Sequence, residues 1–299
     1  MHKSTKTSDK TLIYAYSIAL ILIWGTAYTM VGYAVVHVAP VWLVASRTCI
    51  AAIILTLYMY IRGRRFPPLT DSVWIWYGGL GFVGMTAPFY FIAQAQMQVD
   101  SGLTAILIGF MPLATIVLAH FFVKGEALSW RKSIGFIIGF SGLFILFMPD
   151  TFALELIEDW RAQSLILLGA TLYAITTILA KLAPEVHASV GACMIVIGAA
   201  VWSLVWLAFS GTPQTLPPTS AILAILGIAV GSTAFAQILY LRLIQISGPT
   251  LIAKLNYLVP ICALVSGIVF LDERFGWRTL MAMGVIFVGL LIARSKGKP

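Results

Sequence analysis

Charged residues are scarce in this 299-residue chain, and acidic residues are the scarcest. Charged residues make up 10% of the chain, whereas ordinary soluble domains carry roughly 25%. All 11 acidic residues fall in loops, at the termini or at the ends of apolar runs. The composition therefore argues against a soluble enzyme. It also leaves out the deep carboxylates that proton- and sodium-coupled carriers often use as relays.

Several catalytic and metal-binding motifs are also missing. No GxxxxGK[ST] loop is present, which argues against an ATP-driven pump. No HExxH, CxxC or His-rich cluster indicates a metal site. Cys49, Cys193 and Cys262 all lie inside apolar runs and predict no disulfide framework. We expect no catalytic residues, no metal and no cofactor. The enzyme alternative is a membrane-embedded one that acts on a lipid or isoprenoid.

Long apolar runs fill most of the chain. Hydrophobic residues make up 60% of it, and the mean hydropathy is +0.97. A spanning helix needs roughly 20 residues, and backbone groups in lipid must bond within their own segment. Continuous apolar runs therefore predict an all-α membrane protein rather than a barrel. Ten spans are expected, at 12–34, 41–61, 73–94, 102–122, 133–148, 164–181, 189–209, 220–241, 250–271 and 277–293.

Basic residues predict how the chain is oriented. Most Lys and Arg residues fall at the termini and in loops on one side of the expected membrane. Only Arg161, Arg274 and Arg278 fall in loops on the other side. Because positive loops stay cytoplasmic, both termini are expected inside the cell. This bias explains the net charge of +8, so no nucleic-acid partner is expected. The first run exceeds a signal-peptide core of about 7–15 residues and is expected to remain as a span.

The second half of the sequence repeats the first. Residues 83–87, VGMTA, recur as 230–234, VGSTA. At the same offset, Glu126, Trp130, Arg131 and Gly142 have the counterparts Glu273, Trp277, Arg278 and Gly289, and Pro112 matches Pro260 within one residue.

These matches predict two five-helix repeats, 1–148 and 164–299, joined by an outer loop at 149–163. Because five is odd, the two copies are inverted relative to each other, the usual architecture of secondary transporters. A duplication kept only for packing is the alternative.

Certain motifs in this order resemble a known family. Trp24-Gly25-Thr26 lies in the first run, Pro112 and Glu126 mark the fourth, and Pro260 and Asp272-Glu273-Arg274 mark the ninth. With the inverted repeat, this pattern resembles the drug/metabolite transporter superfamily, and most closely its EamA-type exporters. Within that family the chain is most similar to bacterial exporters of amino acids, aromatic ones included. The resemblance covers nearly the whole chain. It implies a central cavity lined by helices 1, 3, 4, 6, 8 and 9, with helices 5 and 10 at the periphery.

Polar and aromatic residues inside the runs are the candidate cavity residues. Such residues are costly in lipid unless they face protein or water, and on each run they cluster on one helix face. The candidates are Trp24, Tyr28, Thr86, Tyr90, Gln94, Tyr173, Thr177, Thr233, Gln237 and Tyr240. The alternative is that they join helices through interhelical hydrogen bonds.

The ninth run carries the expected polar end of the cavity. Lys254 could pair with a substrate carboxylate, beside Asn256 and Tyr257, or could snorkel to the interface. Arg47 is expected to snorkel or to form a structural pair, because the family gives its helix no cavity role. Pro112 and Pro260 are candidate hinges whose freed carbonyls could bind a substrate ammonium.

The sequence thus predicts a monomeric secondary transporter of the bacterial inner membrane that exports amino acids, aromatic and other apolar ones included. Its partners would be the small-molecule substrate and the lipid bilayer. We expect it to be an alternating-access facilitator or exchanger; if transport were coupled to protons, Asp100 and His120 would be the candidate coupling residues. The alternatives are an exporter of drugs or other small metabolites, which could be proton-coupled, and a channel. Gly135 and Gly139 have the four-residue spacing of close helix contacts, and packing within the chain is favoured over a dimer contact.

Overall fold

The structure is a computed structural model that describes residues 4–123, 129–147, 156–210, 216–247, 251 and 255–293. All regular secondary structure in these residues is helical. The first half contains α1 (Ser4–Val35), α2 (Pro40–Ile61), α3 (Val73–Gly81), η1 (Phe82–Thr86), α4 (Ala87–Ala95), α5 (Ser101–Ile108), α6 (Met111–Phe122) and α7 (Trp130–Phe147). The second half contains α8 (Leu156–Leu182), α9 (Ala188–Ala208), α10 (Thr219–Leu226), η2 (Gly227–Phe235), α11 (Ala236–Ser247), α13 (Val259–Leu271) and α14 (Trp277–Ala293).

These segments confirm the prediction of ten helical spans. Seven continuous or jointed helices have the length and hydropathy to cross a membrane, and α13 and α14 are shorter apolar helices. Together with α7 they complete the ten. Residues 156–163, expected in the connecting loop, are instead the start of α8. Residues 148–155 lie outside the described part, and the limits of the two repeats remain a prediction.

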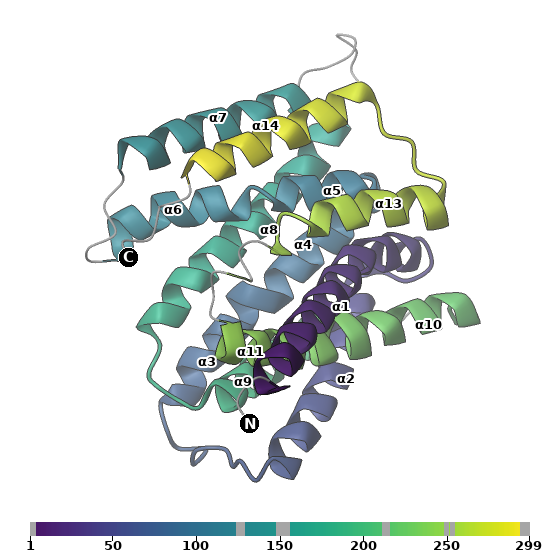
Figure 1. The fold of residues 1–299 in the computed structure, drawn as a ribbon. Coiled ribbons are helices and arrows are strands. Elements are labelled where there is room, and N and C mark those ends of the chain that lie inside the picture. The colour runs from purple at the N-terminus through teal and green to yellow at the C-terminus, as the bar shows by residue number, and fades with distance from the viewer. Residues whose placement is uncertain are drawn as a thin grey trace.

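Helices of the two halves pack against each other in equivalent pairs. α2 packs on α9 and α7 packs on α14, so each pair joins the same helix of both copies. α1 packs on α13 in the way that α8 packs on α6, and η2 lies against α2 as η1 lies against α9. In Figure 1, α1 crosses the bundle between α13 and α10, and α7 runs beside α14 at one edge. Exchanging the halves therefore reproduces the pattern of contacts.

Glycines bring α7 and α14 into backbone contact. A Cβ at Gly135 would lie 2.5 Å from the carbonyl oxygen of Gly289, and a Cβ at Gly289 would meet the backbone of Gly139. Only residues without a side chain allow this approach, as at other small-residue helix contacts. The small-residue spacing in α7 therefore serves packing within the chain, as predicted.

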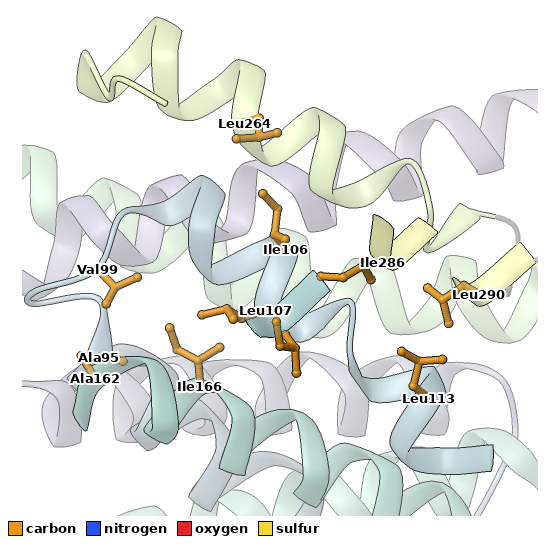
Figure 2. Close-up of a cluster of buried hydrophobic side chains, with 11 residues drawn as sticks. Ala95, Val99, Ile106, Leu107, Leu113, Ala162, Ile166, Leu264, Ile286 and Leu290 are labelled. Carbon is orange, nitrogen blue, oxygen red and sulfur yellow. The ribbon is translucent and has the colours of Figure 1, made fainter. Parts of the chain in front are cut away.

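A hydrophobic cluster ties both halves together beneath that pair. Figure 2 shows Ile106 and Leu107 of α5 among side chains of α8, α13 and α14, including Ile166, Leu264 and Ile286. Each of these five side chains is buried. Burying a Leu or Ile side chain stabilises by about 1.5–3 kcal/mol when it leaves water, but in lipid the gain comes from packing instead.

The repeated VG-x-TA motif forms a π-helical segment in both halves. Residues 83–86 lie in η1 and residues 230–234 lie in η2, and each segment interrupts an α-helical span. A π turn widens the helix and changes the direction of the side chains that follow. Such segments are frequent at functional sites.

The spans that carry Pro112 and Pro260 are both interrupted just before the proline. α5 ends at Ile108 and α6 begins at Met111, so Pro112 occupies the first turn of a new helix. Turns at residues 256–258 precede α13 in the same way, with Pro260 in its first turn. Proline is tolerated there because its missing N–H would have no partner within the helix. Discontinuous helices mark substrate sites in many transporters.

Glu273 of the second half caps the first turn of α5 in the first half. Its Oε1 accepts a hydrogen bond from the Ser101 amide at 2.7 Å, and its Oε2 accepts from Ser101 Oγ at 3.0 Å and from the Gly102 amide at 3.2 Å. A carboxylate at a helix N-terminus also interacts favourably with the helix dipole. The Glu of the repeated motif therefore joins the end of α13 to the start of α5.

We expect acid to stabilise this junction through Asp100. Burial and, second, the Glu273 carboxylate raise the pKa of Asp100. A carboxyl group whose folded-state pKa is raised contributes stability below its unfolded pKa of 3.8, and that contribution is lost as pH rises through the folded value. Asp100→Asn should therefore raise the melting temperature in detergent at pH 7.5. Its advantage over wild type should shrink as the pH falls toward 3.8, and an equal advantage at pH 7.5 and at pH 3.8 would contradict this assignment.

Candidate functional site

A buried arginine lies where the two halves meet. Arg47, in the second turn of α2, is only 7% exposed. Its Nε and Nη2 donate hydrogen bonds of 3.2 and 3.1 Å to Thr233 Oγ1 of η2. Its guanidinium carbon lies 3.7 Å from the centre of the Phe89 ring of α4. Arginine favours such stacking because its planar cation is only weakly hydrated.

Two tyrosines lie near the same guanidinium. Tyr28 of α1 and Tyr173 of α8 both lie within electrostatic range of Arg47. Phe89 packs edge-on against Tyr173, with ring centres 6.5 Å apart. Helices α1, α2 and α4 of the first half thus meet α8 and η2 of the second half around one cation. We call Tyr28, Arg47, Phe89, Tyr173 and Thr233 the central cluster.

The π-helical turn holds Thr233 in position for Arg47. The Thr233 hydroxyl donates a hydrogen bond of 3.0 Å to the carbonyl of Ile228, five residues earlier. Its oxygen is then left to accept from the arginine. Thr233 is 3% exposed, so its hydroxyl has little access to water as another hydrogen-bond partner. The repeated motif therefore supplies the hydroxyl that orients the buried cation.

The snorkelling predicted for Arg47 is wrong. A snorkelling side chain keeps its charged end in water, whereas this guanidinium is enclosed by an aromatic ring and a buried hydroxyl. The sequence predicts Tyr28, Tyr173 and Thr233 at a common site, and the structure brings these three together around Arg47. The sequence does not predict either Arg47 or Phe89 in that group. An arginine well inside an apolar run is the one signal that could have found it.

A second group of predicted residues lies between α1 and α11. Trp24 and Tyr240 pack with ring centres 6.0 Å apart, over a cluster that contains the buried Leu20 and Leu239. Gln237, one turn before Tyr240, is half-buried. This group joins the first span to the eighth, as the central cluster does.

The other predicted residues of the third and sixth spans have local or helix-joining contacts. Thr86 donates to the Ala199 carbonyl of α9 at 2.9 Å, and the Tyr90 ring packs on Trp206 of α9, with ring centres 4.3 Å apart and the rings tilted by 36°. Gln94 donates to the Met97 sulfur, and Thr177 donates to the backbone of its own helix. The contacts of Thr86 and Tyr90 match the helix-joining alternative, whereas those of Gln94 and Thr177 are local. A substrate role for all four remains a prediction.

The expected polar end of the site is only partly described. Lys254 lies outside the described residues. Asn256 is exposed, and the Tyr257 ring packs against Phe287 of α14 with centres 6.0 Å apart. Asn256 and Tyr257 therefore have different surroundings, and their role stays a prediction.

Comparisons with known proteins agree with this architecture. The model of the EamA-like transporter family matches the chain twice, at residues 11–148 and 160–295. The uncharacterized inner membrane transporter YedA of Escherichia coli K12 is 29% identical over 129 residues, which cover 43% of this chain and 41% of YedA. A WAT1-related chloroplast protein of Arabidopsis thaliana is 27% identical over 166 residues, covering 53% of this chain and 38% of its own length. The chain therefore matches less than half of the length of these relatives.

A solved structure shares the fold. The crystal structure of a protein superimposes with a TM-score of 0.67 and 18% identity, covering 94% of this chain and 96% of its own. At this identity the likeness concerns the fold alone. The whole-chain match accords with ten helices in two related halves.

Proposed function

Because the chain belongs to the EamA-like transporter family, we propose that it exports amino acids, aromatic and other apolar ones included, by alternating access. Family membership makes it a multi-pass membrane transporter of a small molecule rather than an enzyme. The observation that carries the amino-acid proposal is the central cluster. A cation, two tyrosines, a phenylalanine and a hydroxyl converge there from both halves. Such a set suits a carboxylate that bears an apolar side chain.

We place the protein in a bacterial inner membrane as a monomer with both termini in the cytoplasm. The name of YedA, an inner membrane transporter, supports the membrane, and the positions of Lys and Arg support the orientation. Contacts between the halves support the monomer, because one chain already assembles the central cluster.

We further propose that transport is facilitated rather than driven by protons. Twelve buried polar side chains are found in the described part of the chain, and none of these is acidic. Carriers coupled to protons often hold a carboxylate at such depth. Uphill accumulation driven by an imposed pH gradient would contradict this part of the proposal.

Counterflow in liposomes tests the function. Purified protein is reconstituted into vesicles preloaded with unlabelled phenylalanine, methionine or threonine, and uptake of the same labelled amino acid is followed. We expect transient, saturable uptake that requires the internal amino acid. Protein-free vesicles and vesicles loaded with buffer alone serve as controls. Uptake that neither saturates nor depends on the internal amino acid would indicate a channel. Absence of counterflow with all three would favour the export of drugs or other metabolites.

A further inference from the structure

Arg47 is a buried cation without a carboxylate partner among the described residues. Its hydrogen bonds there go to Thr233, its face lies on the Phe89 ring, and Tyr28 and Tyr173 are its electrostatic neighbours. At about 1.5 Å per residue, it lies roughly 10 Å inside α2. An unpaired charge at such depth is costly, and membrane proteins retain one chiefly where it acts on a substrate or ion.

The architecture does not require a cation at this position. At the offset of the internal repeat, the counterpart of Arg47 is Met194 of α9, which is fully buried. There α9 packs on η1 as α2 packs on η2, and Thr86 of η1 bonds to a backbone carbonyl of α9 instead. Both helix contacts therefore form, although only one contains an arginine. The packing of α2 on η2 therefore does not depend on the positive charge of Arg47.

The guanidinium presents an unused edge. Nε and one N–H of Nη2 are held by Thr233 Oγ1, and one face is covered by Phe89. Nη1 and the second N–H of Nη2 have no acceptor among the described residues. These donors point along the edge that binds a carboxylate through two parallel hydrogen bonds.

We propose that Arg47 binds the carboxylate of the transported solute, with Tyr28, Phe89 and Tyr173 around its apolar part. The substrate class is therefore a small carboxylate that carries an apolar or aromatic group. This inference rests on the proposed transport function. It does not depend on the solute being an amino acid, because no part of it involves an ammonium group.

Ligand selectivity of the wild-type protein provides the first test. Thermal unfolding in detergent is measured with L-phenylalanine, with L-phenylalaninamide, which lacks the carboxylate, and with 3-phenylpropionate, which lacks the ammonium. We expect 3-phenylpropionate to raise the melting temperature and L-phenylalaninamide to leave it unchanged. Equal stabilisation by phenylalanine and its amide, or no stabilisation by either carboxylate, would overturn the inference.

Variants provide the second test. Arg47→Met, which introduces the residue of the second repeat, should weaken carboxylate binding roughly thirtyfold or more, and Arg47→Lys should retain part of it. Arg62→Met, at the exposed end of the same helix, is the matched control and should bind as wild type does. Lys254→Ala tests the rival cation. Full carboxylate binding by Arg47→Met or Arg47→Lys with loss in Lys254→Ala would assign the carboxylate to Lys254 and overturn the inference.

The outcomes separate this inference from the amino-acid proposal. Stabilisation by 3-phenylpropionate that is lost in Arg47→Met, without phenylalanine counterflow, supports Arg47 and contradicts amino-acid transport. Counterflow of phenylalanine that persists unchanged in Arg47→Met supports amino-acid transport and overturns the role of Arg47. If Arg47→Met does not fold, Arg47→Lys and the wild-type selectivity still decide the matter.

Discussion

Replacing Glu273 by alanine is expected to destabilise the protein by about 2–3 kcal/mol, because it removes an ionised acceptor of three hydrogen bonds. The amides of Ser101 and Gly102 would lose their partner at the start of α5. A fall of several degrees in the melting temperature in detergent is the expected result. Transport should fall as well, since the α5–α13 junction links the two halves.

Two variants calibrate that result. Glu273→Gln keeps one oxygen acceptor without the negative charge and should give an intermediate melting temperature. Glu185→Ala removes an exposed carboxylate and should match wild type. If Glu273→Ala unfolds at the same temperature as Glu185→Ala, the cap contributes nothing to stability.

Gly81→Leu should separate α3 from α9 and destabilise the protein by about 3 kcal/mol. A Cβ on Gly81 would lie 2.5 Å from both the amide nitrogen of Ala199 and the carbonyl oxygen of Ile195. Both are backbone atoms, which cannot rotate away as the end of a flexible side chain can. After mild heating in detergent, we expect the variant to lose its monodisperse peak in size-exclusion chromatography.

Gly79→Leu is the matched control for that substitution. Gly79 lies two residues earlier on the same helix, and a Cβ placed on it would have open space around it, with no neighbouring atom within 4 Å. An added leucine there would face the surroundings rather than α9. Equal loss of folded protein from both variants would mean that leucine harms this helix wherever it is placed.

Much of the fold can be predicted because lipid imposes simple rules. Every apolar run longer than about 17 residues has to be a helix to satisfy its own backbone groups. The offset shared by Thr86 and Thr233, and by Gly142 and Gly289, is enough to identify two copies. The breaks before Pro112 and Pro260 follow from the missing N–H of proline. These signals are local, or they repeat along the chain.

The composition of the central cluster can be predicted only in part. Tyr28, Tyr173 and Thr233 stand out as polar residues in apolar runs. Phe89 does not, because a phenylalanine in such a run has no distinguishing feature. The environment of Arg47 is hidden from the sequence, since the pairing of α2 with η2 is a long-range contact that no local pattern encodes. The π-helical segments escape prediction for a similar reason, because their sequence also suits an α-helix.

The glycine contact between α7 and α14 has a mechanical consequence. Gly135, Gly139 and Gly289 leave no side chains between the two backbones, so the helices are in direct backbone contact. Each of these helices belongs to a different half, so this contact holds the two halves at a short distance from each other along one edge. If one half reorients against the other, the rotation would then be centred near this contact between α7 and α14. The displacement would grow with distance from it and be largest at the far side of the bundle.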